Sequence, residues 1–266
     1  TLELITNEKL GILKTGAKVF VAQQQQCVID QILSVCRDRA FECYTAGKNF
    51  SFQQEEAGAV LYSFKNLNSI INQNKQISNK IRINEMALVG EHQQENVATA
   101  IAVYFSVIEE NKRLSNNQIQ TSLKKINWPG RIQYLNTQKS ILLDGAHNLC
   151  GMRSLLSYLV KNHSTDKILF ATTWMEGKEI IPAFDEFDLS RVTFLPVKIE
   201  MIGTVQIKNV SDGLIQKGYQ TLPMTNSDDL IAKYVHQKTP EYDLVLIAGS
   251  LYLLGEVLTK INNESD

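Results

Sequence analysis

Three polar residues of different chemistry lie close together in the second half of the chain. Asp144, His147 and Asn148 directly follow the apolar run Ile141–Leu143 and offer a carboxylate, an imidazole and an amide to one small volume. The run predicts a short buried strand, and residues 151–160 predict a helix. A strand, a loop and a helix in this order are typical of an open parallel sheet, whose ligands bind beyond the carboxyl ends of the strands. An ordinary connection, in which Asn148 only caps the helix, explains the same residues equally well.

A second group of polar residues follows another predicted strand. Ser250 and Tyr252 come soon after the apolar run Leu244–Ala248, and a helix is expected to begin beside them. Helix N-termini favour anions, so this half of the chain could hold a small anionic ligand. Alternatively, Ser250 only caps its helix and Tyr252 is a half-buried aromatic residue at the surface.

The elements that must position these residues alternate along the second half of the chain. Strands are expected at 132–135, 140–144, 167–172, 192–197 and 244–248. Helices are expected after Asn148, around 178–187, and at 210–217, 228–236 and 251–261. Strands separated by helices predict βαβ units and a parallel sheet, so the fold class expected for this half is α/β.

The first half of the chain has a less regular pattern. Helices are expected at 2–10, after the glutamines 23–26, at 93–110, and from a capping box at Ser115 and Gln118 to about residue 126. The other expected elements are a strand at 18–22, a strand–turn region at 39–52, an edge strand at 59–64 and a loosely packed hairpin or loop at 66–84. The Pro-Gly pair within 127–130 predicts a boundary, so we expect domains at 1–126 and 127–266.

Composition excludes several classes of protein. The chain has 266 residues, 44% of them hydrophobic, which suits one or two domains with substantial cores. The formal net charge of −1 gives no bulk basic character for binding nucleic acid or a membrane surface, and no apolar run approaches the roughly 20 residues of a membrane span.

The cysteines and the first residues indicate a compartment. Cys27, Cys36, Cys43 and Cys150 show no paired metal spacing, so we expect buried free thiols in a reducing cytoplasm. The chain starts with Thr1 and lacks the pattern of a signal peptide, so we expect a fragment or a processed product.

Four stretches, taken together and in this order, resemble one enzyme family. They are 8–14 (Glu-Lys-Leu-Gly-Ile-Leu-Lys), 90–96 (Gly-Glu-His-Gln-Gln-Glu-Asn), 128–131 (Trp-Pro-Gly-Arg) with Gln133 and 144–148 (Asp-Gly-Ala-His-Asn), and 249–256 (Gly-Ser-Leu-Tyr-Leu-Leu-Gly-Glu). The chain is similar to the folylpolyglutamate synthase/dihydrofolate synthase family of the Mur ligase group. The resemblance implies that 1–126 is the end of a central ATPase domain. It also implies that 127–266 is a Rossmann-like C-terminal glutamate-ligase domain with a mainly parallel sheet.

The resemblance also implies roles for single residues. His147, Ser250 and Tyr252 match positions that face L-glutamate, and His147 with Asp144 would be the catalytic pair. Arg131, Asp144 and Asn96 match positions that contact ATP. Lys9 matches a lysine that is carbamoylated, which would give Mg²⁺ an anionic oxygen ligand.

Each of these roles has a simpler alternative. Arg131 alone would be a surface ion-pair partner, Asn96 a polar residue on the solvent face of its helix, and Lys9 a surface lysine beside Glu8. His92 and Gln93 are given only packing or hinge roles.

The family reaction is ATP-dependent amide formation. A carboxylate of a folate or dihydropteroate substrate is phosphorylated by ATP, the amine of L-glutamate attacks the acyl phosphate, and phosphate leaves. Mg²⁺ and cationic groups would neutralise the nucleotide, and the two substrates must be brought together.

The chain departs from the family in several places. The family's phosphate loop lies upstream of the stretch at 8–14, and no stretch of this sequence resembles it. Gly47-Lys48 lacks the upstream glycine and the following Ser or Thr of such a loop. Leu10 stands where Ala is usual, Leu149 replaces a frequent Pro, and 171–179 matches poorly, so we assign no function there.

Three interpretations remain open at this point. The chain is the C-terminal part of a folate:glutamate ligase that acts with an N-terminal half, on a separate chain or in a longer protein. Or it is a non-catalytic remnant of a split or decaying gene, at most a glutamate- or nucleotide-binding module. A different Mur-type ligase, such as a cell-wall amino-acid ligase, is disfavoured by the Trp-Pro-Gly-Arg and Gly-Ser-Leu-Tyr forms.

Overall fold

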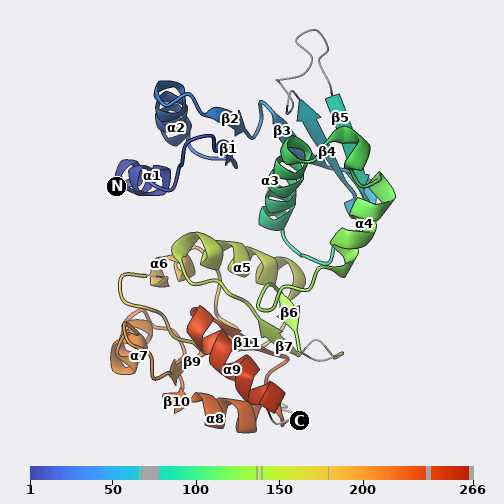
Figure 1. Ribbon diagram of the computed structural model, residues 1–266. Helices are drawn as coiled ribbons and strands as arrows, with labels where there is room; N and C mark the ends of the chain where they lie inside the picture. Colours follow the sequence, from blue (N-terminus) through green and yellow to red (C-terminus); the bar gives the residue numbers. More distant parts are fainter. Residues whose placement is uncertain are drawn as a thin grey trace. The chain divides into compact units, whose positions relative to one another are not determined.

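The computed structural model describes residues 1–65, 67, 78–135, 137–138, 140–178, 180–237 and 241–263. The chain divides into two compact units, Thr1–Asn127 and Trp128–Asp266. Figure 1 draws the elements of both units in sequence colours.

Unit 1 begins with two helices and two short parallel strands. The elements are α1 (Leu2–Leu10), β1 (Lys18–Val21), α2 (Gln26–Asp38) and β2 (Glu42–Thr45). β1 and β2 pair in parallel from Lys18↔Glu42 to Val21↔Thr45. The helix and strand predicted at 2–10 and 18–22 are therefore present, and α1 ends at Gly11 as expected.

An antiparallel sheet of three strands follows in the order β3-β4-β5. The strands are β3 (Phe50–Gln54), β4 (Val60–Lys65) and β5 (Ser78–Ile83), with a short 3₁₀ turn, Glu56–Gly58, after β3. β4 pairs with β3 on one side and with β5 on the other, so the prediction of an edge strand at 59–64 is wrong. Its residues Val60, Tyr62 and Phe64 are buried. Part of the loop or hairpin expected at 66–84 is β5, and residues 66 and 68–77 of it lie outside the described residues.

Two helices complete unit 1. α3 (Glu91–Val107) packs against the three-stranded sheet through Val97, Ala98, Ile101, Ala102 and Phe105. After a 3₁₀ turn at Glu110–Lys112, the predicted capping box is present. Ser115 accepts from the Gln118 amide at the start of α4 (Asn116–Lys125), and the Gln118 side chain accepts from the Ser115 amide.

Unit 2 contains a six-stranded sheet in the order β10-β9-β8-β11-β7-β6 (Figure 1). Its strands are β6 (Gln133–Tyr134), β7 (Ile141–Leu143), β8 (Ile168–Thr172), β9 (Val192–Lys198), β10 (Thr225–Asn226) and β11 (Leu244–Ala248). Five strands are parallel, and β6 pairs antiparallel with β7. The predicted α/β class with a mainly parallel sheet is confirmed, and the short edge strand β10 was not predicted.

Helices cover both faces of this sheet. α5 (Leu149–Asn162), α6 (Ile181–Phe184) and α7 (Ile207–Gln216) share one core with alternate strand residues such as Phe170, Phe194 and Leu246. α8 (Ser227–Leu230), a π-helical stretch (Ile231–Val235) and α9 (Leu251–Asn263) share the other core with residues such as Leu169 and Ile247. α6 is shorter than the helix expected at 178–187. Pro182 stands in its first turn, which fits a helix that begins at Ile181.

The strand order creates one place where neighbouring connections diverge. β11 lies between β7 and β8, and it runs parallel to both. The chain leaves β7 towards α5 on one face of the sheet and leaves β11 towards α9 on the other. Such a switch point opens a crevice at the carboxyl ends of the two strands, where open α/β sheets bind ligands.

The cysteines only partly follow expectation. All four are free thiols, but Cys27 and Cys150 are exposed, so the prediction that they are buried is wrong for these two. Burial and the neighbouring Cys36 raise the pKa of the Cys43 thiol to about 12, so it stays protonated at neutral pH. Within the described ranges, no helix combines the length and the apolar character needed to cross a bilayer.

The packing of β11 predicts a large effect of one truncation. Leu246 is fully buried in the core beneath α5, so Leu246→Ala should lower the free energy of unfolding of unit 2 by about 2–5 kcal/mol. Both tryptophans, Trp128 and Trp174, lie in unit 2, so urea unfolding followed by tryptophan fluorescence measures it directly. The control is Val160→Ala on the outer side of α5, where the side chain is half exposed, and equal effects of the two variants would contradict this core.

Candidate functional site

The carboxylate of Asp144 joins two segments at the carboxyl end of β7. Its Oδ2 accepts the backbone N–H of Ile132 at 2.9 Å, and its Oδ1 accepts the backbone N–H of Ala146 at 2.8 Å. The residue is 6% exposed. Asp144 therefore braces the loop after β7 against the segment before β6, and part of its hydrogen-bonding capacity is committed to this brace.

A close approach of two glycines reinforces the same junction. Gly145 N–H donates to the carbonyl of Gly130 at 2.6 Å, and Gly130 N–H donates to Oε1 of Gln133 at 2.8 Å. Gly130 has φ +73°, and a Cβ there would lie 2.5 Å from Cδ2 of Leu254. Only glycine satisfies both the left-handed backbone and the close contact with α9.

Arg131 lies between these two anchors. The next residue, Ile132, has φ +46°, a strained value for a β-branched side chain, which the hydrogen bond to Asp144 helps to hold. Nη1 of Arg131 lies 3.3 Å from the position of a Cβ on Gly145, so the guanidinium lies against the loop after β7. It makes no hydrogen bond or ion pair with the residues that the structure describes, which leaves its donors available for an anion.

His147 has one ring nitrogen committed and one available. Nδ1 lies 2.8 Å from the carbonyl oxygen of Gly145. Because a carbonyl only accepts, Nδ1 carries the hydrogen and Nε2 carries the lone pair. Nε2 has no hydrogen-bond partner within the described part of unit 2, so it can accept a proton from a ligand amine.

The other predicted residues of unit 2 are at helix starts. Asn148 Oδ1 accepts from Gly151 N–H at 2.8 Å, and Ser250 Oγ accepts from Tyr252 N–H at 3.2 Å. Both Asn148 and Ser250 therefore cap their helices. The loops are joined by a bond of 2.9 Å from Gly249 N–H to the Ala146 carbonyl, and Tyr252 is 49% exposed beside them.

Two residues at this edge had been given no role from sequence. The hydroxyls of Thr172 and Thr173, at the carboxyl end of β8, are buried without a hydrogen-bond partner among the described residues. Gly249, at φ +105°, approaches Thr172 Oγ1 and the Thr173 carbonyl so closely that no Cβ would fit. The signal was two hydroxyl residues at the end of a predicted strand, but 171–179 matched the family too poorly to assign them a function.

In unit 1, Asn96 and Lys9 lie in the environments that their simpler alternatives describe. Asn96 is exposed on α3 and donates to Oε1 of Gln93 at 3.1 Å, while Gln93 is buried and contacts Nε2 of His92 at 3.0 Å. The Lys9 side chain is 71% exposed and pairs with Glu8 at 3.4 Å. The described residues contain no group of three or more His, Cys, Asp and Glu side chains that could hold a metal ion.

A cavity of about 380 Å³ lies in unit 1 between α3 and β3. Its lining includes Gln23, Phe52, Gln54, Glu91 and Glu95. It has two carboxylates and no Lys or Arg, so it would repel the phosphates of a nucleotide.

Comparison with known proteins connects this geometry to one family. Residues 130–260 match the family model described as "Dihydrofolate synthetase, C-terminal domain". A Bacillus subtilis dihydrofolate synthase/folylpolyglutamate synthase is 23% identical over 98% of this chain. The Yersinia pestis enzyme solved with AMPPNP and Mn ion has a TM-score of 0.71, with 19% identity over 98% of this chain. E. coli FolC in complex with DHPP and ADP has a TM-score of 0.75, with 18% identity over 99% of this chain.

The fold of unit 2 is that of a Mur-ligase C-terminal domain. Within it, residues 130–260 belong to the folylpolyglutamate synthase/dihydrofolate synthase family, and the whole chain is similar to members of that family. The chain spans 58% of the B. subtilis relative and 57% of each of the two solved chains.

The brace predicts a cost for an isosteric change. In Asp144→Asn one amide N–H of the brace would face the new NH₂ group, so we expect a loss of about 1–3 kcal/mol in the unfolding free energy of unit 2. Urea unfolding by tryptophan fluorescence measures it. The matched control, Asp212→Asn on the exposed side of α7, should leave the midpoint unchanged. An unchanged midpoint in Asp144→Asn would show that the carboxylate does not brace the two segments.

Proposed function

We propose that this chain is the acceptor-binding part of an ATP-dependent ligase that adds L-glutamate to a folate or dihydropteroate carboxylate through an acyl phosphate. The family membership supports the reaction class. The observation that carries the proposal is the pair of available groups at the switch point, the guanidinium of Arg131 and Nε2 of His147.

L-Glutamate would bind in the crevice between the ends of β7 and β11. The N-termini of α5 and α9 both begin there and favour the negative charge of its carboxylates. Ser250 and Tyr252 would contact the amino acid from the start of α9. The hydroxyl of Ser250 keeps its hydrogen for donation, since its oxygen accepts from the Tyr252 amide.

His147 would be the group that handles the proton of the attacking amine. An ammonium ion cannot attack a carbonyl, so L-glutamate must lose a proton before or during bond formation. Nε2 faces no competing donor among the described residues, and the Nδ1 bond to Gly145 fixes the tautomer. The amine then attacks the acyl carbon, the C–N bond forms, and phosphate leaves with the C–O bond pair.

Arg131 would neutralise the phosphate groups of ATP and of the acyl phosphate. Its planar fork can donate two parallel hydrogen bonds to phosphate oxygens and remains charged at any physiological pH. For Asp144 we propose two roles, the brace itself and, by the family resemblance, contact with ATP.

For unit 1 we propose the end of the central ATPase domain at 1–126, followed by the glutamate-ligase domain at 127–266. Asn96 would contact adenine, because its amide is exposed and can pair with an exocyclic amine. Lys9 remains the proposed carbamoyl-lysine because it matches that lysine of the family, although its side chain is exposed beside Glu8. When bound, Mg²⁺ would neutralise nucleotide charge, and phosphate oxygens would have to supply many of its ligands.

The proposed reaction also needs a phosphate loop from another part of the enzyme. No stretch of the 266 residues has the spacing of a phosphate loop, so we propose that an N-terminal half supplies it, on a separate chain or in a longer protein. The expected setting is the cytoplasm, with no nucleic-acid or membrane partner.

Ligand titration of the purified chain tests the site. In calorimetry, His147→Ala should weaken L-glutamate binding and Arg131→Ala should weaken AMPPNP binding, each by roughly 10- to 100-fold, the range for hydrogen bonds to charged groups. The matched controls are His236→Ala and Arg153→Ala, which remove an exposed imidazole and a half-exposed guanidinium elsewhere in unit 2. Equal losses in variants and controls would rule out specific roles for His147 and Arg131.

Turnover tests the need for a second part. We expect no phosphate release by the chain alone with ATP, L-glutamate and dihydropteroate or tetrahydrofolate, because the sequence contains no phosphate loop. Adding a separately produced N-terminal part of the B. subtilis relative should start release, with that intact relative as the assay control. Release by the chain alone would contradict the expectation. Ligand binding without release in the mixture would favour a non-catalytic remnant.

A further inference from the structure

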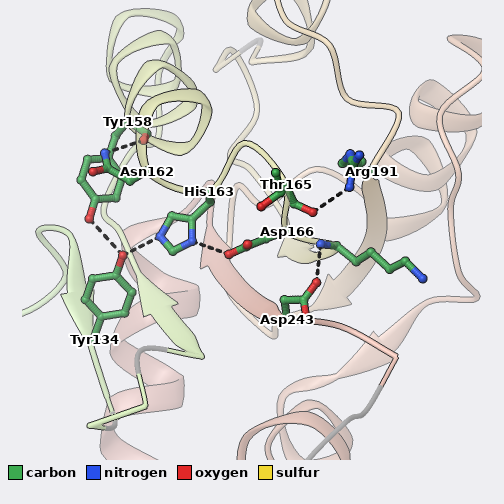
Figure 2. Close-up of polar contacts among 9 residues, drawn as sticks. Tyr134, Tyr158, Asn162, His163, Thr165, Asp166, Arg191 and Asp243 are labelled. Atoms are coloured by element: carbon green, nitrogen blue, oxygen red, sulfur yellow. Dashed lines mark hydrogen bonds and ion pairs between the residues drawn. The ribbon is translucent and has the colours of Figure 1, made fainter.

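A chain of hydrogen bonds joins β6 to the C-terminal end of α5 (Figure 2). The Tyr134 hydroxyl lies 2.6 Å from Nε2 of His163 and 2.9 Å from the hydroxyl of Tyr158. His163 Nδ1 lies 2.7 Å from Oδ2 of Asp166. We name Tyr134, Tyr158, His163 and Asp166 the α5 clasp. None of these four residues belongs to the proposed ligand site.

The α5 clasp has a consistent direction of donors. The Asp166 carboxylate accepts from Nδ1–H of His163, which leaves the Nε2 lone pair to accept from the Tyr134 hydroxyl. The oxygen of Tyr134 can then accept from Tyr158. Burial, assisted by the Tyr158 hydroxyl, raises the pKa of Tyr134, so its hydroxyl remains a donor at neutral pH. The His163 side chain is only 11% exposed, so these bonds are largely shielded from water.

β6 is weakly held by the sheet alone. It is an edge strand that pairs over two positions, Gln133↔Leu143 and Tyr134↔Leu142. Arg131 precedes Tyr134 by three residues, and between them Ile132 has a strained left-handed backbone. A two-residue edge pairing gives little resistance to local opening. The segment therefore needs a further anchor on the side away from the brace.

We propose that His163 is a positioning residue for Arg131. Asp166 orients the imidazole, the imidazole fixes the Tyr134 hydroxyl, and Tyr134 holds β6 in register, so that the Arg131 guanidinium stays against the loop after β7. The inference rests on the proposed role of Arg131 in binding nucleotide phosphate. It places the control of that cation at Tyr134, three residues further along the chain than Arg131.

The α5 clasp is better suited to this task than to covalent chemistry. A Tyr–His–Asp chain could activate a nucleophile, but the raised pKa of Tyr134 opposes formation of a phenolate. Tyr134 and Tyr158 also contact the His163 ring, with centroids 6.1 Å apart in both pairs. Aromatic contacts and directed hydrogen bonds together restrict the side chain of Tyr134.

Amide hydrogen exchange, resolved by NMR, tests without any ligand whether the α5 clasp holds the segment around β6. Tyr134→Phe and Asp166→Ala should each increase the exchange rates of the Gly130 and Ile132 amides about five- to tenfold, the change expected when one hydrogen bond that resists opening is lost. Amides of β11 and α9 should keep their wild-type rates. A uniform increase over unit 2 would mean general destabilisation and would overturn the proposal, as would unchanged rates at Gly130 and Ile132.

Two further variants separate positioning from loss of packing. Asp166→Asn keeps an acceptor for Nδ1–H of His163, so it should restore near wild-type rates relative to Asp166→Ala. Arg153→Ala removes a different α5 contact, to Glu186, and should leave the Gly130 and Ile132 amides unaffected. If Asp166→Asn exchanged as fast as Asp166→Ala, the hydrogen bond would not be the operative contact.

Calorimetry with AMPPNP and L-glutamate on the same proteins tests the effect of the α5 clasp on ligand binding. Tyr134→Phe and Asp166→Ala should weaken AMPPNP binding at least threefold and leave L-glutamate binding within error, because the hydrogen bond that orients His147 lies within its own loop, from Nδ1 to the Gly145 carbonyl. Equal losses for both ligands would contradict a role directed at Arg131. A wild-type chain that binds no AMPPNP would instead contradict the proposed nucleotide role, and the exchange rates would still decide whether the α5 clasp holds the segment.

Discussion

One buried carboxylate accepts hydrogen bonds from two backbone N–H groups, and the candidate site depends on this interaction. Asp144 receives N–H groups from Ile132 before β6 and from Ala146 after β7, and this fixes where the antiparallel edge strand starts relative to the parallel sheet. The unusual backbone of Ile132 and the close approach of Gly130 to α9 are both tolerable only while that geometry is held. A buried charge is costly unless it is hydrogen-bonded, so the same interaction that positions the site also satisfies the charge.

The groups available for chemistry are few, and they share one edge of the sheet. The Arg131 guanidinium and Nε2 of His147 remain without partners among the described residues, while the surrounding polar atoms of Asp144, Asn148 and Ser250 are engaged with backbone amides. A preorganised site needs both kinds of group: bonded groups that hold the loops in place, and groups without partners that can bind the ligand. The α5 clasp is part of the first category, although it lies towards the other end of α5.

Sequence predicted unit 2 well because its strands are buried on both faces and appear as continuous apolar runs such as Leu244–Ala248. It did not predict that β6 is antiparallel, because two residues carry no periodicity, and it placed β4 at an edge although this strand pairs on both sides. The sequence drew attention to Asp144 at the end of a predicted strand. Its brace depends on the backbone amide of Ile132, which residue types alone do not reveal. The buried hydroxyls of Thr172 and Thr173 became visible only with coordinates. The roles of Asn96 and Lys9 still rest on resemblance.

The two edges of the six-stranded sheet have a consequence for how the protein behaves at high concentration. β6 and β10 each pair over only two residues, so the sheet ends on both sides in very short stretches of open backbone. A long open edge would act as a template for a strand from another molecule, and this is a common start of aggregation. The sheet of unit 2 has an apolar, parallel interior, so the addition of strands from other molecules at its edges would lead to aggregation. The short edge strands β6 and β10 protect against this.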